Sequence, residues 1–218
     1  MPGPIDSLRF VHEAILAEAD AIEAAVAEAG SPADAGELAA RVAYYGSLVD
    51  RHTRGEEIGL FPALAEKVPG LAEAYVFDHR DERELFEELA GLFERCAGGD
   101  ADALSRLRRQ VVALSEHVHS HVRKENELVL PLVHEHFTPP EQGAMVQKIL
   151  STIPPEDMQV AVPWIVSRLR TETAVAYVRV LEGAMPPPVF AAAKGWLRNG
   201  LSAERWGALG AEIPSLTV

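Results

Sequence analysis

The sequence predicts an all-α protein in which an up-down, antiparallel four-helix bundle is followed by a helical C-terminal extension. Apolar residues recur at alternating steps of three and four along four long segments, which is the spacing of one buried helix face. Breaks containing Gly or Pro separate these segments by short links, of the kind that join neighbouring antiparallel helices. The breaks are Gly30-Ser31-Pro32, Pro69-Gly70 and Gly98-Gly99-Asp100.

The four segments follow one another along the chain, and each keeps its apolar period. The first runs over residues 8–26 and the second over 38–56, while the third and fourth run over 72–93 and 107–132. Helices joined in this way run alternately up and down. Residues 1–137 are therefore expected to form the bundle as one domain.

One polar pattern, His-x-Arg-x-Glu, is written twice on the buried stripe. It runs from His52 to Glu56 in the second segment and from His121 to Glu125 in the fourth, and in both copies a Pro stands six residues after the Glu. The four-residue step places each His and Glu on one helix face, one turn apart. Each copy therefore offers a pair of metal ligands to the core.

Two further histidines complete a set of ligands. His12 and His79 fall on the buried stripes of the first and third segments, where an unpartnered polar group would cost roughly 2 to 7 kcal/mol. Both lie early in their helices, and the two motifs lie late in theirs, so all four histidines reach the same end of an antiparallel bundle. A shared metal centre would compensate for their burial. The predicted ligands are His12, His52, Glu56, His79, His121 and Glu125.

The composition of this ligand set favours two iron ions. Four histidines and two carboxylates are too many ligands for one tetrahedral zinc, while bridging carboxylates suit harder cations such as iron or manganese. In this interpretation Glu56 and Glu125 bridge the two irons, and the histidines are terminal ligands. A ferritin-like centre would instead use Glu-x-x-His motifs on two helices.

The order and spacing of these residues resemble the hemerythrin-like (His-His-Glu, or HHE) domain family over about residues 5–137. The resemblance implies a non-haem di-iron centre, oxo- or hydroxo-bridged, that binds or reacts with dioxygen or related small molecules. The third helix departs from the oxygen-carrying members, which have two histidines four residues apart there. Here Tyr75 and Arg83 stand four residues from His79, which argues against reversible oxygen carriage. Glu82, one turn past His79, is a further candidate metal ligand, and Tyr75 or water are the alternatives at that position.

Three functions remain open at this stage. The first is a protein that binds or senses iron, dioxygen, nitric oxide or peroxide at the di-iron centre. The second is a di-iron enzyme that activates oxygen or reduces peroxide or nitric oxide, with Glu82 or Tyr75 as proton donor and no catalytic residue yet assigned. The third is a metal-free or zinc-bearing helical scaffold, which would leave six polar core positions without a purpose.

Composition restricts the partners and the compartment. The formal net charge of −13 disfavours nucleic acid, and no apolar run approaches the length of a membrane span. Cys96 is the single cysteine, so no internal disulfide can form, and a reducing, cytoplasmic location is expected. The first residues show no secretion signal, which agrees with that expectation.

Residues 138–218 are expected to form a helical annex. Pro-containing helix starts divide this stretch into short segments that are apolar on one side, and these stripes could cover the bundle or mediate a homodimer. The stretch from Pro163 to Leu169, with Trp196 and Trp206, weakly resembles the extension that follows the hemerythrin repeats of BRUTUS-type plant iron regulators. A RING-type ligase activity is excluded because zinc-binding cysteines are missing.

Overall fold

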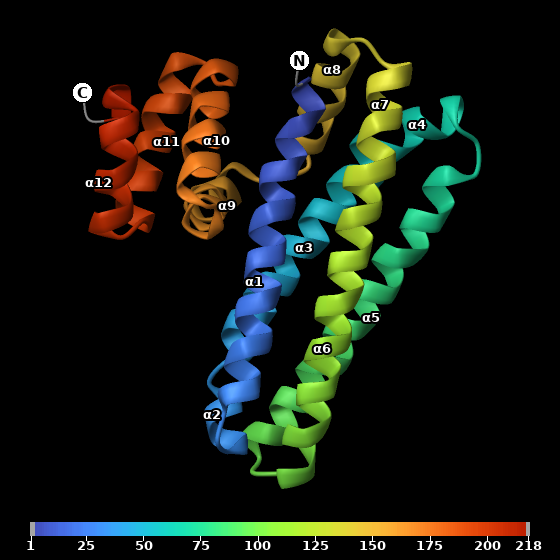
Figure 1. Ribbon diagram of the computed structural model, residues 1–218, viewed down its shortest axis with the longest axis vertical. Helices are drawn as coiled ribbons and strands as arrows, with labels where there is room; N and C mark the ends of the chain where they lie inside the picture. Colours follow the sequence, from blue (N-terminus) through green and yellow to red (C-terminus); the bar gives the residue numbers. More distant parts are fainter. Residues whose placement is uncertain (1–2, 217–218) are drawn as a thin grey trace. The chain divides into compact units, whose positions relative to one another are not determined.

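The structure, a computed structural model, describes residues 3–216, and these residues form helices and turns without any strand (Figure 1). The prediction of an all-α fold is therefore confirmed. None of the helices in this range is both long and apolar enough to cross a membrane. The elements are η1 (Pro4–Ser7), α1 (Leu8–Glu28), α2 (Pro32–Gly36), α3 (Ala39–Gly59), α4 (Phe61–Lys67), α5 (Leu71–Ala97), α6 (Ala101–Lys124), the π-helix η2 (Glu125–Val129), α7 (Leu130–His136), α8 (Pro139–Leu150), α9 (Pro155–Arg168), α10 (Thr171–Ala184), α11 (Pro187–Gly200), α12 (Ala203–Glu212) and η3 (Pro214–Leu216).

The chain divides into two compact units. One is Leu16–Thr152, and the other combines Met1–Ile15 with Ile153–Val218. Helix α1 contributes residues to both units because the division falls within it. The predicted domain boundary between residues 137 and 138 stays a prediction.

Polar caps fix where two of the helices begin. The Ser31 side chain accepts a hydrogen bond from the backbone N–H of Asp34 at 3.2 Å, and α2 starts at the next residue. The Asp100 carboxylate accepts from the backbone N–H groups of Asp102 and Ala103 at the start of α6. Such caps satisfy N–H groups that have no partner inside the helix.

The long helices of the first unit pack antiparallel. On α6, His119 Nε2 lies 2.8 Å from Asp20 Oδ1 of α1, and Arg108 donates to the carbonyl of Ala29 at 2.6 Å. Moving towards the start of α6 therefore means moving towards the end of α1. Helices α3, α5 and α6 also lie side by side, with α5 packed against both of the others (Figure 1).

A proline follows each His-x-Arg-x-Glu motif and coincides with a change in helix geometry. Helix α3 ends at Gly59, and the separate helix α4 begins at Phe61, directly before Pro62. Before Pro131, the chain forms the π-helix η2 and then resumes as α7. Proline removes an N–H donor and crowds the preceding turn, which favours such breaks.

Helix α8 belongs to the first unit and packs against α3 where α3 has two glycines. A Cβ added at Gly59 would lie 2.5 Å from Ile149 Cγ1 and 2.8 Å from its backbone nitrogen, while one at Gly55 would lie 2.8 Å from Ile149 Cγ2. These distances are too short for any larger residue without movement of α8. The close packing holds the end of α3, just past its motif, in place.

The second unit is built around helices α9 to α12 and the start of α1. Its apolar core includes Val166, Val178 and Leu197, and it takes in Ala14 from α1. Glu13, next to Ala14, accepts hydrogen bonds from the backbone N–H of Arg170 at 3.0 Å and from the Thr173 hydroxyl at 2.7 Å. The Phe10 ring also packs on the Tyr177 ring, with centroids 5.3 Å apart.

Candidate metal centre

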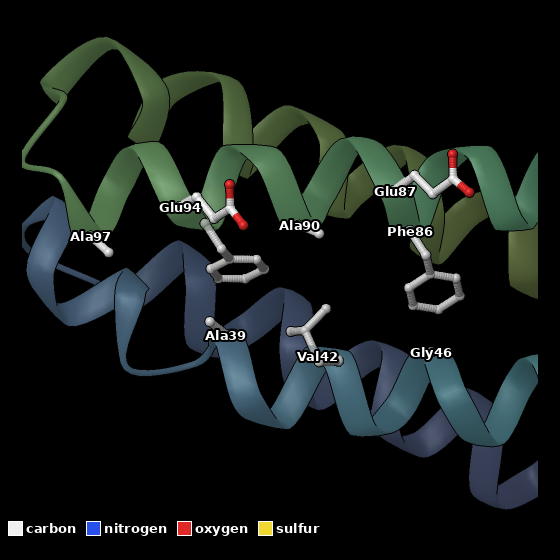
Figure 2. A pocket seen from close by; sticks show the side chains of 10 residues that line it. Ala39, Val42, Gly46, Phe86, Glu87, Ala90, Glu94 and Ala97 are labelled. Atoms are coloured by element: carbon white, nitrogen blue, oxygen red, sulfur yellow. The ribbon is translucent and has the colours of Figure 1, made fainter.

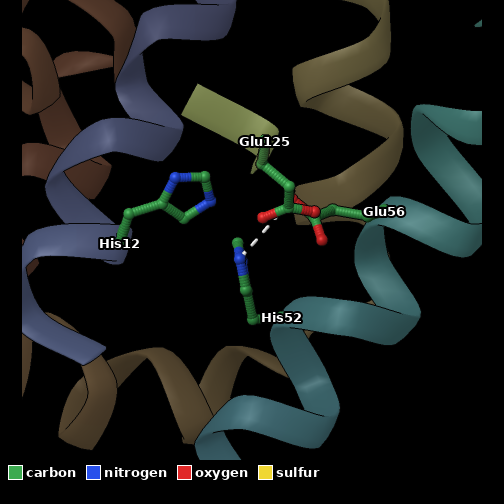
Figure 3. Close-up of side chains that lie close together, drawn as sticks. All are labelled: His12, His52, Glu56 and Glu125. Atoms are coloured by element: carbon green, nitrogen blue, oxygen red, sulfur yellow. Dashed lines mark ion pairs between the residues drawn. The ribbon is translucent and has the colours of Figure 1, made fainter. Parts of the chain in front are cut away.

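Buried His and Glu side chains form two groups, each able to hold a metal ion. One group is His12, His52, Glu56 and Glu125 (Figure 3), and the other is Glu56, His79, His121 and Glu125. Within each group, one ligand atom from every residue lies within 4.8 Å of the others. Glu56 and Glu125 belong to both groups, and each group has two histidines of its own.

The ligand atoms converge closely in the second group. His79 Nε2 lies 3.1 Å from His121 Nε2 and 3.7 Å from Glu56 Oε2. His121 Nε2 lies 3.2 Å from Glu125 Oε1. In the first group, His52 Nε2 lies 3.5 Å from Glu56 Oε1. All of these side chains are buried, and the most exposed, His52, shows 7% of its side-chain surface.

The two motifs present their ligands from different backbone geometries. His52 and Glu56 lie one turn apart in the regular helix α3. His121 lies in the last turn of α6, and Glu125 is the first residue of the π-helix η2. A π-helical turn shifts the direction of the side chains that follow it and is common at functional sites. The second motif therefore places Glu125 at an irregular point of the backbone.

A carboxylate from α5 orients His121. Asp78 Oδ2 accepts a hydrogen bond from His121 Nδ1 at 3.2 Å, and the same oxygen pairs with the Lys124 ammonium. Burial would raise the pKa of Asp78, but the hydrogen bonds from Lys124 and His121 hold it below its usual value. The bond at Nδ1 turns Nε2 of His121 towards Glu125.

His79 has the same kind of support from α3. Its Nδ1 lies 3.0 Å from Glu57 Oε1, and Arg83 donates to that oxygen at 3.4 Å. Both histidines of this group thus keep Nε2 directed at the shared carboxylates while Nδ1 binds an outer carboxylate. Outer hydrogen bonds of this type fix the tautomer and raise the basicity of metal-binding histidines.

The charges of these two histidines are complementary. Burial lowers the pKa of His79, and so does the nearby charge on His121. Burial opposes the charged form of His121 too, but Glu125 above all, with Glu82 and Asp78, raises the pKa of His121 to about 9. Without a cation, the raised pKa favours a protonated His121 at neutral pH, with its Nε2–H facing Glu125 Oε1 at 3.2 Å and His79 Nε2 at 3.1 Å.

The carboxyl groups of the centre repel one another. Burial and the charge of Glu125 raise the pKa of Glu56 well above its usual value. Burial is also the main cause that raises the pKa of Glu82 to about 7. A bound cation would remove this repulsion, because it lets several buried carboxylates be ionised together.

The donor set and its spacing fit metal ions. Nitrogen and oxygen ligands bind at about 2.0 to 2.2 Å, so neighbouring ligands of one ion stand roughly 3 Å apart. The measured separations in the second group, from 3.1 Å between the two histidine nitrogens to 4.0 Å between His79 Nε2 and Glu125 Oε1, are close to that spacing. Imidazole and carboxylate together are suitable ligands for iron.

Glu82 and Tyr75, the other candidates from the sequence, are in neither ligand group of residues 3–216. Glu82 is buried on α5, but it belongs to neither group among residues 3–216, so its role as a ligand stays a prediction. The Tyr75 hydroxyl donates to the backbone carbonyl of Lys124 at 3.3 Å, directly before the π-helix. Burial, helped by Glu125 and Asp78, raises the pKa of Tyr75 to about 12. Its hydroxyl supports the backbone at Glu125.

Sequence reasoning did not assign a role to the outer partners of the histidines. Asp78 and Lys124 act on His121 from positions that no apolar period distinguishes. Glu57 directly follows the first motif, and Arg83 stands one turn past His79. The bonds join different helices, so no spacing within one helix predicts them. The one signal in the sequence was that Glu57 and Asp78 each stand next to a predicted metal ligand.

The fold and the site together define an all-α protein with a buried His/Glu cation-binding centre. The model of the hemerythrin HHE cation-binding domain family matches residues 3–133, and the chain belongs to that family. The resemblance predicted from the His and Glu spacing is thereby confirmed. No solved structure matches the chain.

Three plant proteins are similar over most of the chain. Zinc finger protein BRUTUS of Arabidopsis thaliana is 29% identical over 186 residues, which is 84% of this chain and 15% of that protein. Two BRUTUS-like zinc finger proteins of the same plant are 24% and 25% identical over 76% and 77% of this chain. The chain therefore spans only about a seventh of the length of these relatives, at 13% to 15%.

Proposed function

We propose that the chain is a non-haem di-iron protein that binds or senses iron, dioxygen or a related small molecule such as nitric oxide or peroxide. One iron would be held by His12 and His52, the other by His79 and His121, with Glu56 and Glu125 bridging both. Iron at such a centre supplies Lewis-acid and redox chemistry. The protein residues hold the ions, orient the rings and exclude water.

The observation that carries the proposal is the sharing of Glu56 and Glu125 between the two ligand groups. A single metal site would not require two separate pairs of histidines around one pair of carboxylates. Two ions held by shared carboxylates account for all six side chains. Because these side chains are buried, the centre is kept away from bulk water. A small ligand could therefore reach the metals without competition from solvent.

Iron suits this donor set better than zinc does. Structural zinc sites are four-coordinate and use cysteine and histidine, whereas this centre is rich in carboxylate oxygen and holds six side chains. The outer bonds from Glu57 and Asp78 increase electron donation by His79 and His121, which supports a metal that changes its oxidation state.

The test is loading with ferrous iron without oxygen, followed by separate exposure to dioxygen, nitric oxide and hydrogen peroxide. We expect close to two irons per chain and a near-ultraviolet absorption change with at least one of these molecules. The size and reversibility of each change identify the ligand. Retention of zinc alone, or iron binding with no spectral response to any of the three, would contradict the proposal.

A di-iron enzyme is the second candidate, and one observation favours it. A surface cavity of about 250 Å³ between α3 and α5 is lined in part by Glu82, whose charge acts on Glu56. A substrate could therefore approach the centre from this side. Multiple turnovers with peroxide or an organic substrate would distinguish the enzyme from a sensor.

A further inference from the structure

Two surface cavities of similar volume differ in the charge of their lining. The cavity between α3 and α5 measures about 490 Å³, and its only charged lining residues among residues 3–216 are the acids Glu87 and Glu94 (Figure 2). The cavity between α9 and α11, called the α9–α11 groove below, measures about 450 Å³ and is lined by one charged residue of the same range, Arg168. Both volumes are within the range of small-molecule pockets. The α9–α11 groove is therefore the one suited to a negatively charged ligand.

Each of the two helices turns one face to the α9–α11 groove. On α9, Val160, Trp164 and Arg168 line it at steps of four residues, and on α11 Trp196 and Gly200 do the same. Residues four apart lie on one helix face, one turn above the other. The aromatic side chains and the arginine therefore border the same space.

A direct contact between the helices closes one part of the groove. Pro163 is buried and lines the groove, and a Cβ added at Gly200 would lie 2.5 Å from Cβ of Pro163 and 2.9 Å from its Cγ. The backbone of α11 thus packs on the proline ring, with no room for a larger residue. This contact fixes the spacing of α9 and α11, so the groove is formed before a ligand binds.

Trp164 and Trp196 give the groove two aromatic surfaces. Both are partly buried and pack against the apolar core of the second unit, which holds one part of each side chain in place. Another part of each lines the groove. Large rings with few rotatable bonds lose little conformational freedom on binding, and they favour other aromatic rings as neighbours. These two side chains therefore suit a ligand with a planar ring.

Arg168 is held at the groove by two of its neighbours. Its guanidinium carbon lies over the Trp164 ring, 5.4 Å from the ring centre, and its Nη1 donates to the Ser167 hydroxyl at 2.8 Å. Contact with an indole face and a hydrogen bond both restrict a planar guanidinium. A guanidinium matches the geometry of a carboxylate, which can accept two parallel hydrogen bonds from it.

The charges around the groove strengthen this preference. Helix α11 contains Lys194 and Arg198 and no acidic residue. The acids of α9, Glu156 and Asp157, are in its first turn, roughly 16 Å or more along the helix axis from Arg168. That separation is about twice the distance over which physiological salt screens exposed charges. The positive charge of Arg168 is therefore not cancelled by an acid of either helix.

We propose that the α9–α11 groove binds a small aromatic carboxylate, with the carboxylate at Arg168 and the ring against Trp164 and Trp196. A neutral or positive aromatic molecule would lose the pair with the guanidinium, and a saturated acid would lose the contacts between rings. None of the residues that line the groove is among the six that could hold metal. The site therefore goes beyond the di-iron proposal and does not depend on it.

Calorimetric titration of the full chain tests the proposal. The probes are 2-naphthoate, decahydro-2-naphthoate and 2-naphthylmethylamine, which share a two-ring skeleton and differ in aromaticity or in charge. We expect 2-naphthoate to bind one molecule per chain, at least about tenfold more tightly than the other two. Equal binding of the saturated acid or of the amine, or no binding of 2-naphthoate, would overturn the proposal.

Matched variants locate the site. Arg168→Gln and Trp196→Leu should each weaken 2-naphthoate binding by about tenfold or more. Arg198→Gln is the control for charge, because Arg198 is exposed on α11 and does not line the groove. Trp206→Leu is the control for packing, because Trp206 packs against the same core outside the groove. Full binding in the Arg168 or Trp196 variant, or an equal loss in its control, would overturn the assignment.

Discussion

The two His-x-Arg-x-Glu motifs have the same pattern but different surroundings. The residue before the Glu is Gly55 in the first motif and Lys124 in the second. Gly55 leaves room for Ile149 of α8, whereas Lys124 reaches Asp78, the carboxylate that orients His121. The first motif is thus held by close helix packing and the second by charge and by a π-helical turn. A repeated ligand pattern can therefore be supported by two different means.

The largest expected effect on metal content comes from removing a shared carboxylate, and it should be the same for the two motifs. Glu56→Ala and Glu125→Ala should each remove both metal ions, because each carboxylate belongs to both ligand groups. Metal analysis and near-ultraviolet absorption measure the loss, and far-ultraviolet circular dichroism checks the helices. Glu127→Ala, an exposed acid on the π-helix, serves as control. If either variant kept two metals, the bridging role of that residue would be wrong.

Removing a histidine of α1 or α5, which lie outside the two motifs, should remove one metal ion instead of two. His12→Ala affects the group containing His52, and His79→Ala affects the group containing His121. Each variant should retain about one metal per chain, since the other pair of histidines is unchanged. Stoichiometry after reconstitution checks this, with exposed His136→Ala as control. Loss of both metals in the two variants would show that the positions are not independent.

The outer carboxylates should have a smaller effect, on affinity and not on stoichiometry. Glu57→Gln and Asp78→Asn remove the bonds to Nδ1 of His79 and His121. We expect metal affinity to fall roughly 10- to 100-fold in each, as for other outer-shell partners of metal ligands. Competition with a chelator of known affinity measures this. Unchanged affinity in both variants would remove these carboxylates from the account.

The charge on His121 predicts a pH dependence of the metal-free protein. Its pKa is about 9 in the folded chain and 6.5 in the unfolded chain, so the stability it contributes is fully present below pH 6.5. That contribution is lost as the pH rises through 9. The melting temperature should therefore fall over this window, and less so in His121→Gln. An equal fall in the variant would assign the effect to other groups.

The smallest effect on metal binding is expected where packing alone supports the first motif. Gly59→Ala should destabilise the protein by about 1 to 3 kcal/mol, since its Cβ would overlap Ile149, while the metal content remains unchanged. Gly91→Ala on α5 is the control, because a Cβ there meets nothing within 4 Å. Denaturant unfolding measures both, and equal stability of the two variants would contradict the packing argument.

The sequence predicted the helical fold and the main ligand candidates because both follow a helical period. His12, His79 and the two motifs lie on apolar stripes, and a polar residue on such a stripe is visible without a structure. The structure brings the six candidate ligands into the two groups, whereas Glu82 lies outside them. Glu82 is buried on the same helix as His79, but the step of three residues turns its side chain by about 60° around the helix axis from that of His79.

Other features depended on contacts between distant parts of the chain. The bonds of Asp78 and Glu57 to histidines cross from one helix to another, and no spacing within a helix predicts them. The π-helix at Glu125 was also not predicted, although Pro131 indicated an irregularity near it. The pairing of Glu13 with Arg170 and Thr173 joins segments 157 and 160 residues apart and required the structure.

The most direct test of the central claim is iron stoichiometry combined with low-temperature electron paramagnetic resonance of the oxidised protein. Two ferric ions that share Glu56 and Glu125 should couple magnetically. We therefore predict close to two irons per chain and almost no ferric signal. One iron per chain with the strong signal of an isolated ferric ion would contradict the shared centre.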